Sequence, residues 1–372
     1  MMNPAELRAD IPAVQNATYM NTGASGPSPR RVVEAARGFL ERAEYEVHAT
    51  DDIYEYTFGE YDRIRDRLAE FVGASPSELA LTESTTDGIA RFASGIDWEP
   101  GDVVVRTDLE HPAGILPWQR LEREGVEVRV VETEHGRIDL DDFAEAVADA
   151  RLACFSALTW THGTQLPVAA LADIARDAGA LTLVDAVQVP GQAPIDVEEW
   201  GVDAVAAAGH KWLLGLWGGG FLYVRREVAD ELEPRSVGYR SVQSPGASSF
   251  EFKEGAPRLE IGTTNLAAHV GLLEAIETVE SIGLETIQDR IRKLTDRFKA
   301  GVPEDRLLSP REYESGLVTV DVSDPEKTVE RLDDAGFKVR SIPPMNAMRV
   351  SLHVFNTPAE VDALLAELDA VR

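Results

Sequence analysis

The sequence predicts an α/β protein, in which a mostly parallel β-sheet has helices on both faces and is followed by a smaller α+β domain. Three observations indicate this class. Short apolar runs alternate with helical patterns from about residue 30 to residue 225, which is typical of a parallel sheet covered by helices. The chain has 372 residues, 44% of them hydrophobic, and so can build a large core and a second domain. The alternation stops near residues 240–257, in a segment rich in Ser, Gly and Pro.

Seven apolar runs supply the expected strands of the large sheet. In chain order they are ELALTE, DVVVRTDL, VEVRVVET, RLACFSAL, LTLVDAV, VDAVAAAG and GGFLYVR. Amphipathic patterns such as IDLDDFAEAVADA and VAALADIARDAG lie between most of these runs and predict the covering helices. We therefore expect a sheet of the seven-stranded type.

The C-terminal part of the chain departs from this rhythm. We expect a mobile loop over 240–257 and a connecting helix over about 266 to 300. Strand-like runs (GLVTVDVS, KVRSIPP, MRVSLHVF) and helical runs (EKTVERLDDAGF, TPAEVDALLAELDAV) then predict a small α+β unit. Accordingly, we assign residues 1–20 to an N-terminal arm that packs on the small domain. Residues 21–257 form the large domain, and residues 258–372 form the connector helix and the small domain.

Charge and composition narrow the class of protein. Acidic residues outnumber basic ones 65 to 36, for a net charge of −29, so a nucleic-acid partner is disfavoured by repulsion. Only six of the basic residues are lysines, a balance that suits a protein kept soluble at high salt, although an ordinary acidic cytosolic protein is the alternative. No run of 18 apolar residues and no signal-like start appear, so we expect a cytoplasmic protein that does not enter a membrane.

The single cysteine, Cys154, excludes an intramolecular disulfide and a zinc site with two or more cysteine ligands. It lies in the apolar run RLACFSAL, so core packing is the expected role. We predict no metal site.

Lys211 is the first lysine of the chain, after 210 residues that contain none. It follows the apolar run VDAVAAAG and is flanked by few charged residues, which indicates a site of low dielectric. Burial lowers the pKa of an amine, as an imine-forming lysine requires, and arginine cannot form that imine. The alternative is a surface lysine at a strand end.

Asp185 ends another apolar run, with Gln188 three residues further on. Ligands of open α/β sheets bind at the carboxyl ends of the strands, so this acid faces a site together with Lys211. Capping of a following helix is the alternative for an aspartate in this position. A lysine and an acid together suit pyridoxal phosphate, which needs an imine and a protonated ring nitrogen.

The cofactor phosphate needs an anion site of its own. Ser84, Thr85 and Thr86 lie between a strand and a helix that starts near Asp87, where free backbone N–H groups and hydroxyls can bind an anion. Ordinary Ser/Thr capping is the alternative. The run GLWGGGF leads into a strand rather than a helix, which excludes a dinucleotide-binding loop.

Eight ordered segments of the chain resemble one known family. They are YMNTGASGPSP, ESTTDGIA, LEHPAGILPWQ, THGTQLPV, LVDAVQVPG, GHKWLLG, RLEIGTTN and MRVSLHVFNT. They are similar to the class V, fold-type I pyridoxal-phosphate enzymes, in the branch of cysteine desulfurases and isopenicillin-N-epimerase-like proteins. The resemblance implies that Lys211 holds the cofactor as an internal aldimine and shuttles the Cα proton. Asp185 would pair with the ring nitrogen and Gln188 with the 3-hydroxyl oxygen, and His111 would stack on the ring.

The same resemblance implies further contacts. Thr85, Thr86 and His210 would hold the phosphate. Thr263 would reach the phosphate of a neighbouring subunit, which implies a homodimer with the active site at its interface. Arg349 would bind the substrate carboxylate in a bidentate manner, with Arg340 and Trp160 also at the substrate; a surface arginine is the alternative for Arg349.

Three departures from the desulfurase pattern bear on the reaction. Ala208 replaces the usual serine of the lysine motif, and Trp160 replaces an asparagine, as in the epimerase-like branch. No cysteine lies between Phe337 and Arg349, where desulfurases carry their nucleophile. We expect an enzyme that deprotonates Cα of an α-amino acid, for transamination, racemisation or epimerisation, or β-elimination. A desulfurase that forms its persulfide on an external thiol or on Cys154, and an inactive cofactor-binding scaffold, are the alternatives.

Overall fold

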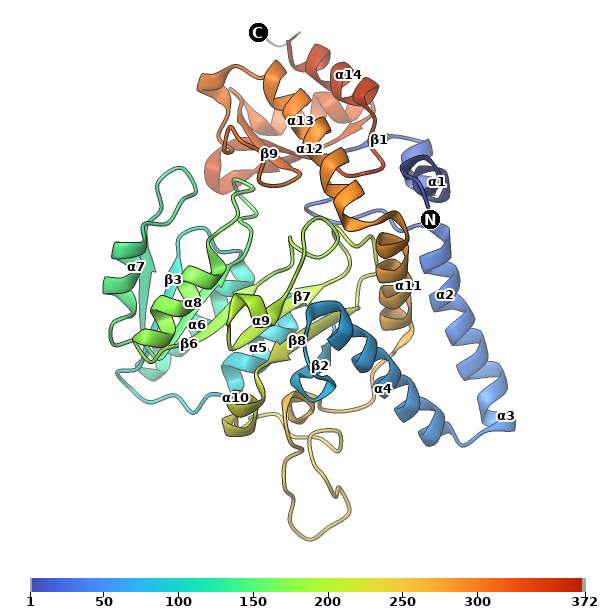
Figure 1. Ribbon diagram of the computed structural model, residues 1–372, viewed down its shortest axis with the longest axis vertical. Coiled ribbons are helices and arrows are strands. Elements are labelled where there is room, and N and C mark those ends of the chain that lie inside the picture. The colour runs from blue at the N-terminus through green and yellow to red at the C-terminus, as the bar shows by residue number, and fades with distance from the viewer. Residues whose placement is uncertain (1, 370–372) are drawn as a thin grey trace.

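The computed structural model describes residues 2–369 and contains a seven-stranded sheet in its large domain (Figure 1). The strand order is β2-β8-β7-β6-β5-β3-β4, and only β8 runs antiparallel to its neighbours. The strands are β2 (Leu79–Thr82), β3 (Val103–Thr107), β4 (Glu127–Val131), β5 (Leu152–Ser156), β6 (Leu181–Asp185), β7 (Ala204–Ala208) and β8 (Gly220–Val224). Each of the seven predicted runs contains one strand, so the predicted fold class is confirmed.

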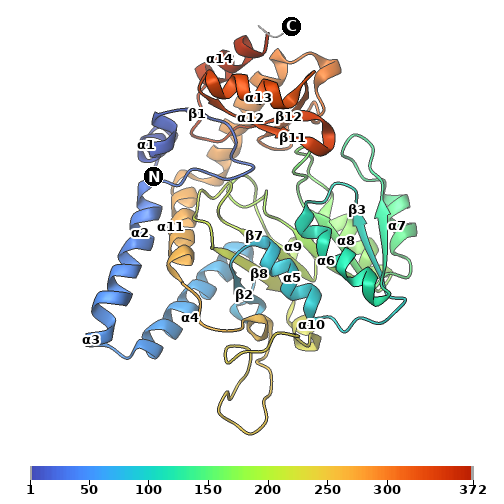
Figure 2. The same cartoon turned by 180° about the vertical axis from the view of Figure 1, so that it is seen from behind.

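Helices cover both faces of this sheet, as the two views from opposite sides show (Figure 2). Successive side chains of a strand point to opposite faces, so Leu152 and Cys154 of β5 join one core cluster and Ala153 and Phe155 join the other. The first cluster is covered by α5 (Thr85–Gly95), α6 (Leu116–Leu121) and α10 (Arg226–Glu231). The second is covered by α4 (Ile53–Val72), α7 (Leu140–Val147), α8 (Val168–Asp177) and α11 (Ala267–Ile282). The short helix α9 (Val197–Trp200) also contributes to it.

The C-terminal elements form a three-stranded antiparallel sheet with its own core. The order is β11 (Arg340–Ile342), β12 (Ala347–Ser351) and β9 (Leu317–Asp321). Helices α12 (Leu284–Gly301), α13 (Pro325–Asp334) and α14 (Pro358–Asp369) accompany this sheet. Residues of α12, α13, α14 and these strands share a third hydrophobic cluster, which includes Phe298, Leu332 and Leu364.

The N-terminal segment lies against these C-terminal elements. β1 (Thr18–Tyr19) pairs in parallel with β10 (Phe337–Lys338), and Arg8 of α1 (Pro4–Asp10) forms an ion pair of 2.7 Å with Glu360. The chain then crosses to α2 (Arg30–Glu41), a π-helical turn and α3 (His48–Thr50), and returns in α4 (Figure 1). The residue limits assigned to the two domains stay a prediction.

The connector differs from the single helix that the pattern over 266–300 predicts. Gly283 adopts a positive φ of 87° and ends α11, with its N–H bonded to the Val279 carbonyl at 3.0 Å. An α-helix does not continue through this conformation, so α12 begins as a separate helix at Leu284. The segment 240–257 is a loop as expected and extends away from the body (Figure 1), while its mobility stays a prediction.

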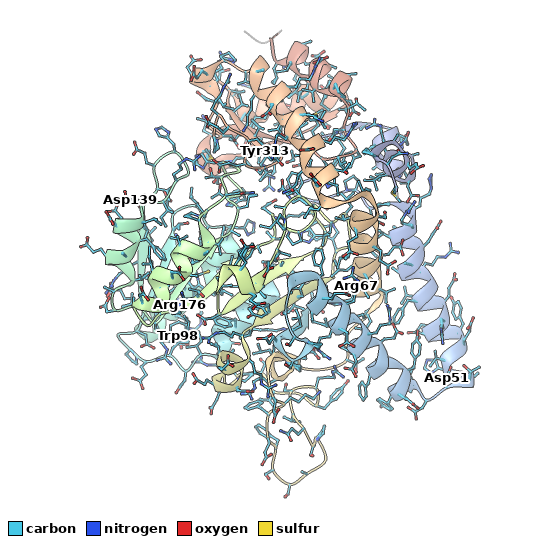
Figure 3. All side chains as sticks on the ribbon, viewed as in Figure 1. Asp51, Arg67, Trp98, Asp139, Arg176 and Tyr313 are labelled. Atoms are coloured by element: carbon cyan, nitrogen blue, oxygen red, sulfur yellow. The ribbon has the colours of Figure 1, made fainter. Side chains whose placement is uncertain are left out.

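Charged side chains are exposed on several sides of the molecule. Asp51 and Asp139 are exposed at distant places on the molecule, as is Arg176 (Figure 3). No helix within residues 2–369 combines the length and the apolar character that a membrane span needs.

Candidate active site

Ten of the eleven site residues predicted from the sequence line one cavity of about 560 Å³. They are Thr85, Thr86, His111, Trp160, Asp185, Gln188, His210, Lys211, Arg340 and Arg349. The cavity lies at the carboxyl ends of β6 and β7, where side chains from the small antiparallel sheet meet the large one. This is the usual place for a ligand in an open α/β sheet.

Lys211 follows β7, and its backbone is packed tightly against the segment 23–26. The Gly26 N–H donates to the His210 carbonyl at 2.7 Å, and a side-chain Cβ at Gly26 would lie 2.1 Å from the Lys211 carbonyl oxygen. Burial lowers the pKa of the Lys211 amine to about 8; Asp185 opposes this shift, while Arg349 and Arg340 add to it. Lys211 is therefore not the surface lysine of the alternative interpretation.

Asp185 is the last residue of β6 and is 4% exposed. Its Oδ1 accepts the Val187 N–H at 2.9 Å, and the next helix, α9, does not begin until Val197, so Asp185 caps no helix. Burial raises the pKa of this carboxyl, while the nearby Lys211 lowers it. The Gln188 amide is buried beside it: its Nε2 donates to the Gly23 carbonyl at 2.9 Å.

His111 is held by its own turn. Its Nδ1 accepts the Ala113 N–H at 3.2 Å, so the neutral ring carries its proton on Nε2. Burial, followed by the positive charges of Lys211, Arg340 and Arg349, lowers the pKa of His111 to about 4. The ring therefore stays neutral at pH 7. It meets the Trp160 ring edge-on, with centroids 5.6 Å apart.

The opposite end of the cavity is the start of α5. Ser84 caps this helix by accepting the Asp87 N–H at 3.1 Å, which makes Thr85 its first residue, two residues earlier than the sequence predicts. Thr85 Oγ1 is buried and has no hydrogen-bond partner within the described residues. His210 stacks on Trp217 with ring centroids 4.4 Å apart, and burial lowers the pKa of His210 to about 4. A neutral hydroxyl, a neutral imidazole and helix N–H groups thus share one end of the cavity.

Two arginines reach the cavity from the small sheet. Arg340 of β11 and Arg349 of β12 are direct register partners, so their side chains leave the same face. Arg349 is completely buried, which excludes the surface alternative, and its Nη1 donates to the Trp160 carbonyl at 2.6 Å. Its Nε and Nη2 have no partner among the residues that the structure describes. Burial and the charge of Arg340 lower the pKa of Arg349 to about 9.

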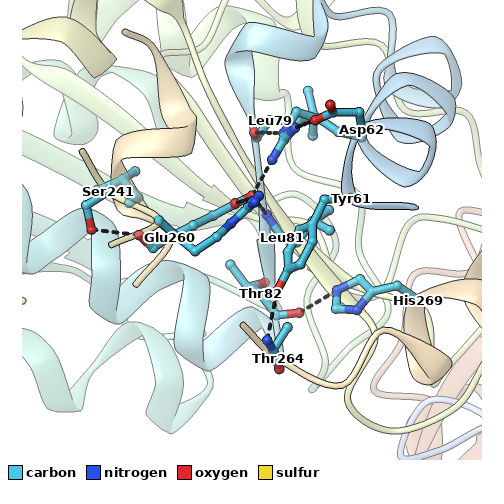
Figure 4. A network of polar contacts seen from close by, with 12 residues as sticks. Tyr61, Asp62, Leu79, Leu81, Thr82, Ser241, Glu260, Thr264 and His269 are labelled. Atoms are coloured by element: carbon cyan, nitrogen blue, oxygen red, sulfur yellow. Dashed lines mark hydrogen bonds and ion pairs between the residues drawn. The ribbon is translucent and has the colours of Figure 1, made fainter. Parts of the chain in front are cut away.

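Thr263 is the predicted site residue that does not line this cavity. Its N–H donates to Tyr239 Oη at 2.7 Å. The next residue, Thr264, belongs to a network of polar contacts that includes Tyr61 and Glu260 (Figure 4). Glu260 accepts hydrogen bonds of 2.8 Å from both Arg65 and Arg240, and Tyr61 Oη accepts the Thr264 N–H at 2.7 Å. Within one chain, Thr263 therefore lies outside the lining of the cavity.

The sequence analysis overlooked several residues that belong to the site or support it. Gly23, Glu83 and Trp217 line the cavity. Glu110 is buried next to His111, accepts hydrogen bonds of 2.7 Å from the hydroxyls of both Thr107 and Ser156, and has a pKa raised to about 7 by burial. The only sign of Glu110 in the sequence was its place in the run LEHPAG, next to His111. An acid in that place is usually exposed, so the sequence did not indicate that Glu110 is buried.

Cys154 does not line the cavity. It is completely buried in the core cluster between the sheet and helices α5 and α6, and burial raises the pKa of its thiol well above the usual range. Among residues 2–369, no cluster of three or more His, Cys, Asp or Glu side chains is placed to hold a metal ion.

The residues present fit pyridoxal phosphate. Thr85 Oγ1 is a buried hydroxyl without a partner at a helix start, as an anion site requires, and Lys211 is an amine with a lowered pKa. Asp185 is a buried acid at the carboxyl end of β6, opposite in charge to a protonated ring nitrogen. Arg349 keeps two unpaired nitrogens for a carboxylate.

Comparisons with known proteins point to the same class of enzyme. The chain is 31% identical over 395 residues to a probable cysteine desulfurase of Methanothermobacter thermautotrophicus, covering 100% of this chain and 98% of the relative. It is similar in structure to an apo cysteine desulfurase of Thermococcus onnurineus NA1, with a TM-score of 0.92, 29% identity and coverage of 100% and 98%.

A second similar structure is the cystine C–S lyase C-DES in complex with its reaction product cysteine persulfide. Its TM-score is 0.88 at 27% identity, with coverage of 96% and 98%. A variant of C-DES has also been solved with glycine covalently linked to its pyridoxal phosphate cofactor. The family model of class-V aminotransferases matches residues 18–364. The chain therefore belongs to the class-V aminotransferase family, and it is an enzyme whose cofactor is pyridoxal phosphate.

Proposed function

We propose that this enzyme is a carbon–sulfur lyase that acts on cystine or a related sulfur amino acid by β-elimination, without forming a persulfide on the protein. One observation carries the proposal: the cavity lined by Lys211, Arg340 and Arg349 contains no thiol, and Cys154 is buried in the core away from it. A desulfurase passes sulfur to a thiolate, whereas a lyase needs only a base and a leaving group. C-DES, a cystine lyase of the same fold, supports this choice.

Lys211 acts as the base in this proposal. Pyridoxal phosphate, when bound, withdraws electrons from Cα of the amino acid and makes its proton acidic. Lys211 Nζ would hold the cofactor, and the same amine, when free and neutral, would take the Cα proton of the substrate. A pKa of about 8 leaves a substantial neutral fraction of this amine near neutral pH.

Asp185 and His111 stabilise the bound ring. The Asp185 carboxylate would pair with the ring nitrogen and favour its protonated form. The neutral His111 ring would stack on the cofactor and, with Trp160, exclude water from one side. Thr85, Thr86 and His210 would hold the phosphate. These assignments account for the unpaired Thr85 hydroxyl.

The two arginines select the substrate. Arg349, with two unpaired nitrogens, binds the α-carboxylate, and Arg340, which is exposed at the rim, faces the second half of a disulfide amino acid. The second carboxylate of such a substrate, placed beside Arg340, would reduce the repulsion between the positive charges of Arg340 and Arg349.

The reaction balances without an added oxidant or reductant. Lys211 removes the Cα proton, the Cα=Cβ double bond forms, and the Cβ–S bond breaks with its electron pair on sulfur. For cystine, the products are cysteine persulfide and 2-aminoacrylate, and water converts the latter to pyruvate and ammonia.

Product analysis tests this proposal. The cofactor-loaded enzyme is incubated with cystine, and separately with cysteine plus an external thiol, and pyruvate and alanine are quantified. We expect one pyruvate for each cystine consumed and no alanine, and Lys211→Ala should remove the activity. Alanine in place of pyruvate would contradict lyase chemistry and favour the cysteine desulfurase that the names of the relatives suggest. Cys154→Ala should leave pyruvate formation unchanged.

We also propose that the enzyme is a homodimer in which Thr263 completes the phosphate site of the partner. Thr263 lies outside its own cavity on a firmly anchored turn, and Trp217, at the cavity rim, is 71% exposed. Mixing the inactive variants Lys211→Ala and Thr263→Val tests this arrangement, because a mixed dimer would regain one complete site. If Thr263 acts within its own chain or not at all, mixing restores nothing.

A further inference from the structure

We propose that Trp212 is a positioning residue that fixes the orientation of the Gln188 amide, so that Gln188 presents only N–H groups to the ring oxygen of the cofactor. The inference rests on the proposed function and on the sequence-based prediction that Gln188 pairs with the 3-hydroxyl oxygen of the ring. Trp212 itself does not line the cavity; it acts on the cofactor through Gln188.

The first support is a hydrogen bond between two buried side chains. Trp212 Nε1 donates to Gln188 Oε1 at 2.7 Å, and the two residues are 0% and 2% exposed. An indole N–H can only donate, whereas an amide has a donating and an accepting end. A rotated amide would place two donors face to face, so this contact determines which end of Gln188 faces the indole.

The second support comes from the other end of the same amide. Gln188 Nε2 donates one of its two hydrogens to the Gly23 carbonyl at 2.9 Å. A carbonyl only accepts, so this contact requires the same orientation as the indole. The second Nε2 hydrogen has no acceptor within the described residues, and Gln188 lines the cavity. It is therefore the group that the amide offers to a ligand.

Trp212 is in turn held by the small sheet and its loops. His353, which follows β12, donates from Nε2 to the Trp212 carbonyl at 2.9 Å and accepts the Val354 N–H on Nδ1 at 2.8 Å. The His353 ring stacks on the indole with centroids 5.6 Å apart, and Gly316 has no room for a side chain beside the indole. The orientation of Gln188, in the turn after β6, is thus set by packing against the C-terminal elements.

This orientation has a chemical consequence. A donor that faces the 3-oxygen stabilises its negative charge, whereas an amide oxygen in the same place would repel it. Stabilising that oxygen makes the bound cofactor release its proton at lower pH. Trp212 should therefore lower the pH midpoint at which the absorption of the bound cofactor changes.

Trp212→Phe tests the inference, because it keeps most of the ring and removes the N–H. In cofactor-loaded enzyme without substrate, we expect the absorption midpoint to rise by about half to one pH unit, the effect of about one neutral hydrogen bond. Trp118→Phe is the matched control: Trp118 is equally buried, lies in α6, and its Nε1 has no hydrogen-bond partner within the described residues. It should leave the midpoint unchanged.

A double-variant cycle separates positioning from general damage. In a Gln188→Ala background, Trp212→Phe should shift the midpoint no further. An equal shift in both backgrounds, or no shift in either, would overturn the inference. If Trp212→Phe does not fold, Gln188→Glu serves instead. Its carboxylate accepts the indole N–H but offers no donor to the cavity, so the absorption midpoint should rise. An unchanged midpoint would refute the proposal that the oriented Gln188 amide donates to the cofactor.

Failure of the proposed function is distinguishable from failure of this inference. The midpoint is measured without substrate and does not depend on which product the enzyme forms. An enzyme that forms no pyruvate but shows the Gln188-dependent shift would contradict the lyase proposal alone.

Discussion

Replacing Arg349 by methionine tests whether this guanidinium serves a ligand or the fold. Arg349 is completely buried, and no carboxylate of residues 2–369 lies within ion-pair distance of it. Arg340, its register partner, adds a second positive charge. An unpaired buried charge is unfavourable in the ligand-free protein and becomes favourable when a carboxylate binds.

The magnitude follows from the pKa of about 9, which lies below the ordinary value of 12.5. Because the folded pKa is lower than the unfolded one, the unfolded chain binds the proton more tightly, and the charged side chain destabilises the fold below about pH 9. A shift of this size corresponds to an upper bound of about 4–5 kcal/mol, partly offset by the hydrogen bond to Trp160 and by packing. We expect Arg349→Met not to lower the unfolding temperature.

Activity should respond in the opposite way. Loss of the charge-assisted bonds to the substrate carboxylate, about 1.5–3 kcal/mol each, should lower kcat/KM by about 10²- to 10⁴-fold. Glycine should stabilise the wild-type holoenzyme against heat but not the variant.

Arg65→Met is the matched comparison. Arg65 is also buried, but it pairs with Glu260 at 2.8 Å and does not line the cavity. Its loss removes a partner of a buried carboxylate and should destabilise the fold by about 3 kcal/mol. The reasoning fails if Arg349→Met loses as much stability as Arg65→Met, or if its kcat/KM stays within threefold of the wild type.

Three further predictions concern loading, backbone packing and salt. The neutral Lys211 amine is the form that attacks the cofactor. The rate at which apo-protein binds the cofactor, followed by absorption, should therefore rise with pH and level off above about pH 8. A rate independent of pH would contradict this. Gly26→Ala should displace the Lys211 backbone and lower cofactor occupancy, because the added Cβ would lie 2.1 Å from the Lys211 carbonyl oxygen. Gly246→Ala is the control, because a Cβ added there has no heavy atom within 4 Å. With a net charge of −29, the unfolding midpoint should rise above about 1 M salt, and no such gain would exclude a halophilic protein.

Local patterns predicted much of the fold. The seven strands of the large sheet were recognisable because each is a short, mostly apolar run bounded by turns, a property of neighbouring residues. The connector was predicted less well, since the positive φ of Gly283 depends on how α11 and α12 pack.

The sequence by itself determined the residue types of the site. Lys211 and Asp185 stand out because Asp185 ends one buried strand and Lys211 follows another, and parallel strands bring their carboxyl ends to one edge. Arg349, in contrast, is one of 30 arginines. Only the family resemblance singled it out in the sequence, and its pairing with Arg340 and its burial then placed it at the cavity.

Tertiary structure alone decided the rest. Two hydrogen bonds, from Trp212 to Gln188 and from His353 to Trp212, join residues that are far apart in the chain. The local sequence also gives no sign that Glu110 is buried or that Thr263 lies outside its own cavity. Strand patterns report which side of an element is buried, but the direction of a hydrogen bond and the partner of a charge depend on which elements meet. For this protein, the sequence determined the cofactor, and the meeting of the two sheets determined how its site is held.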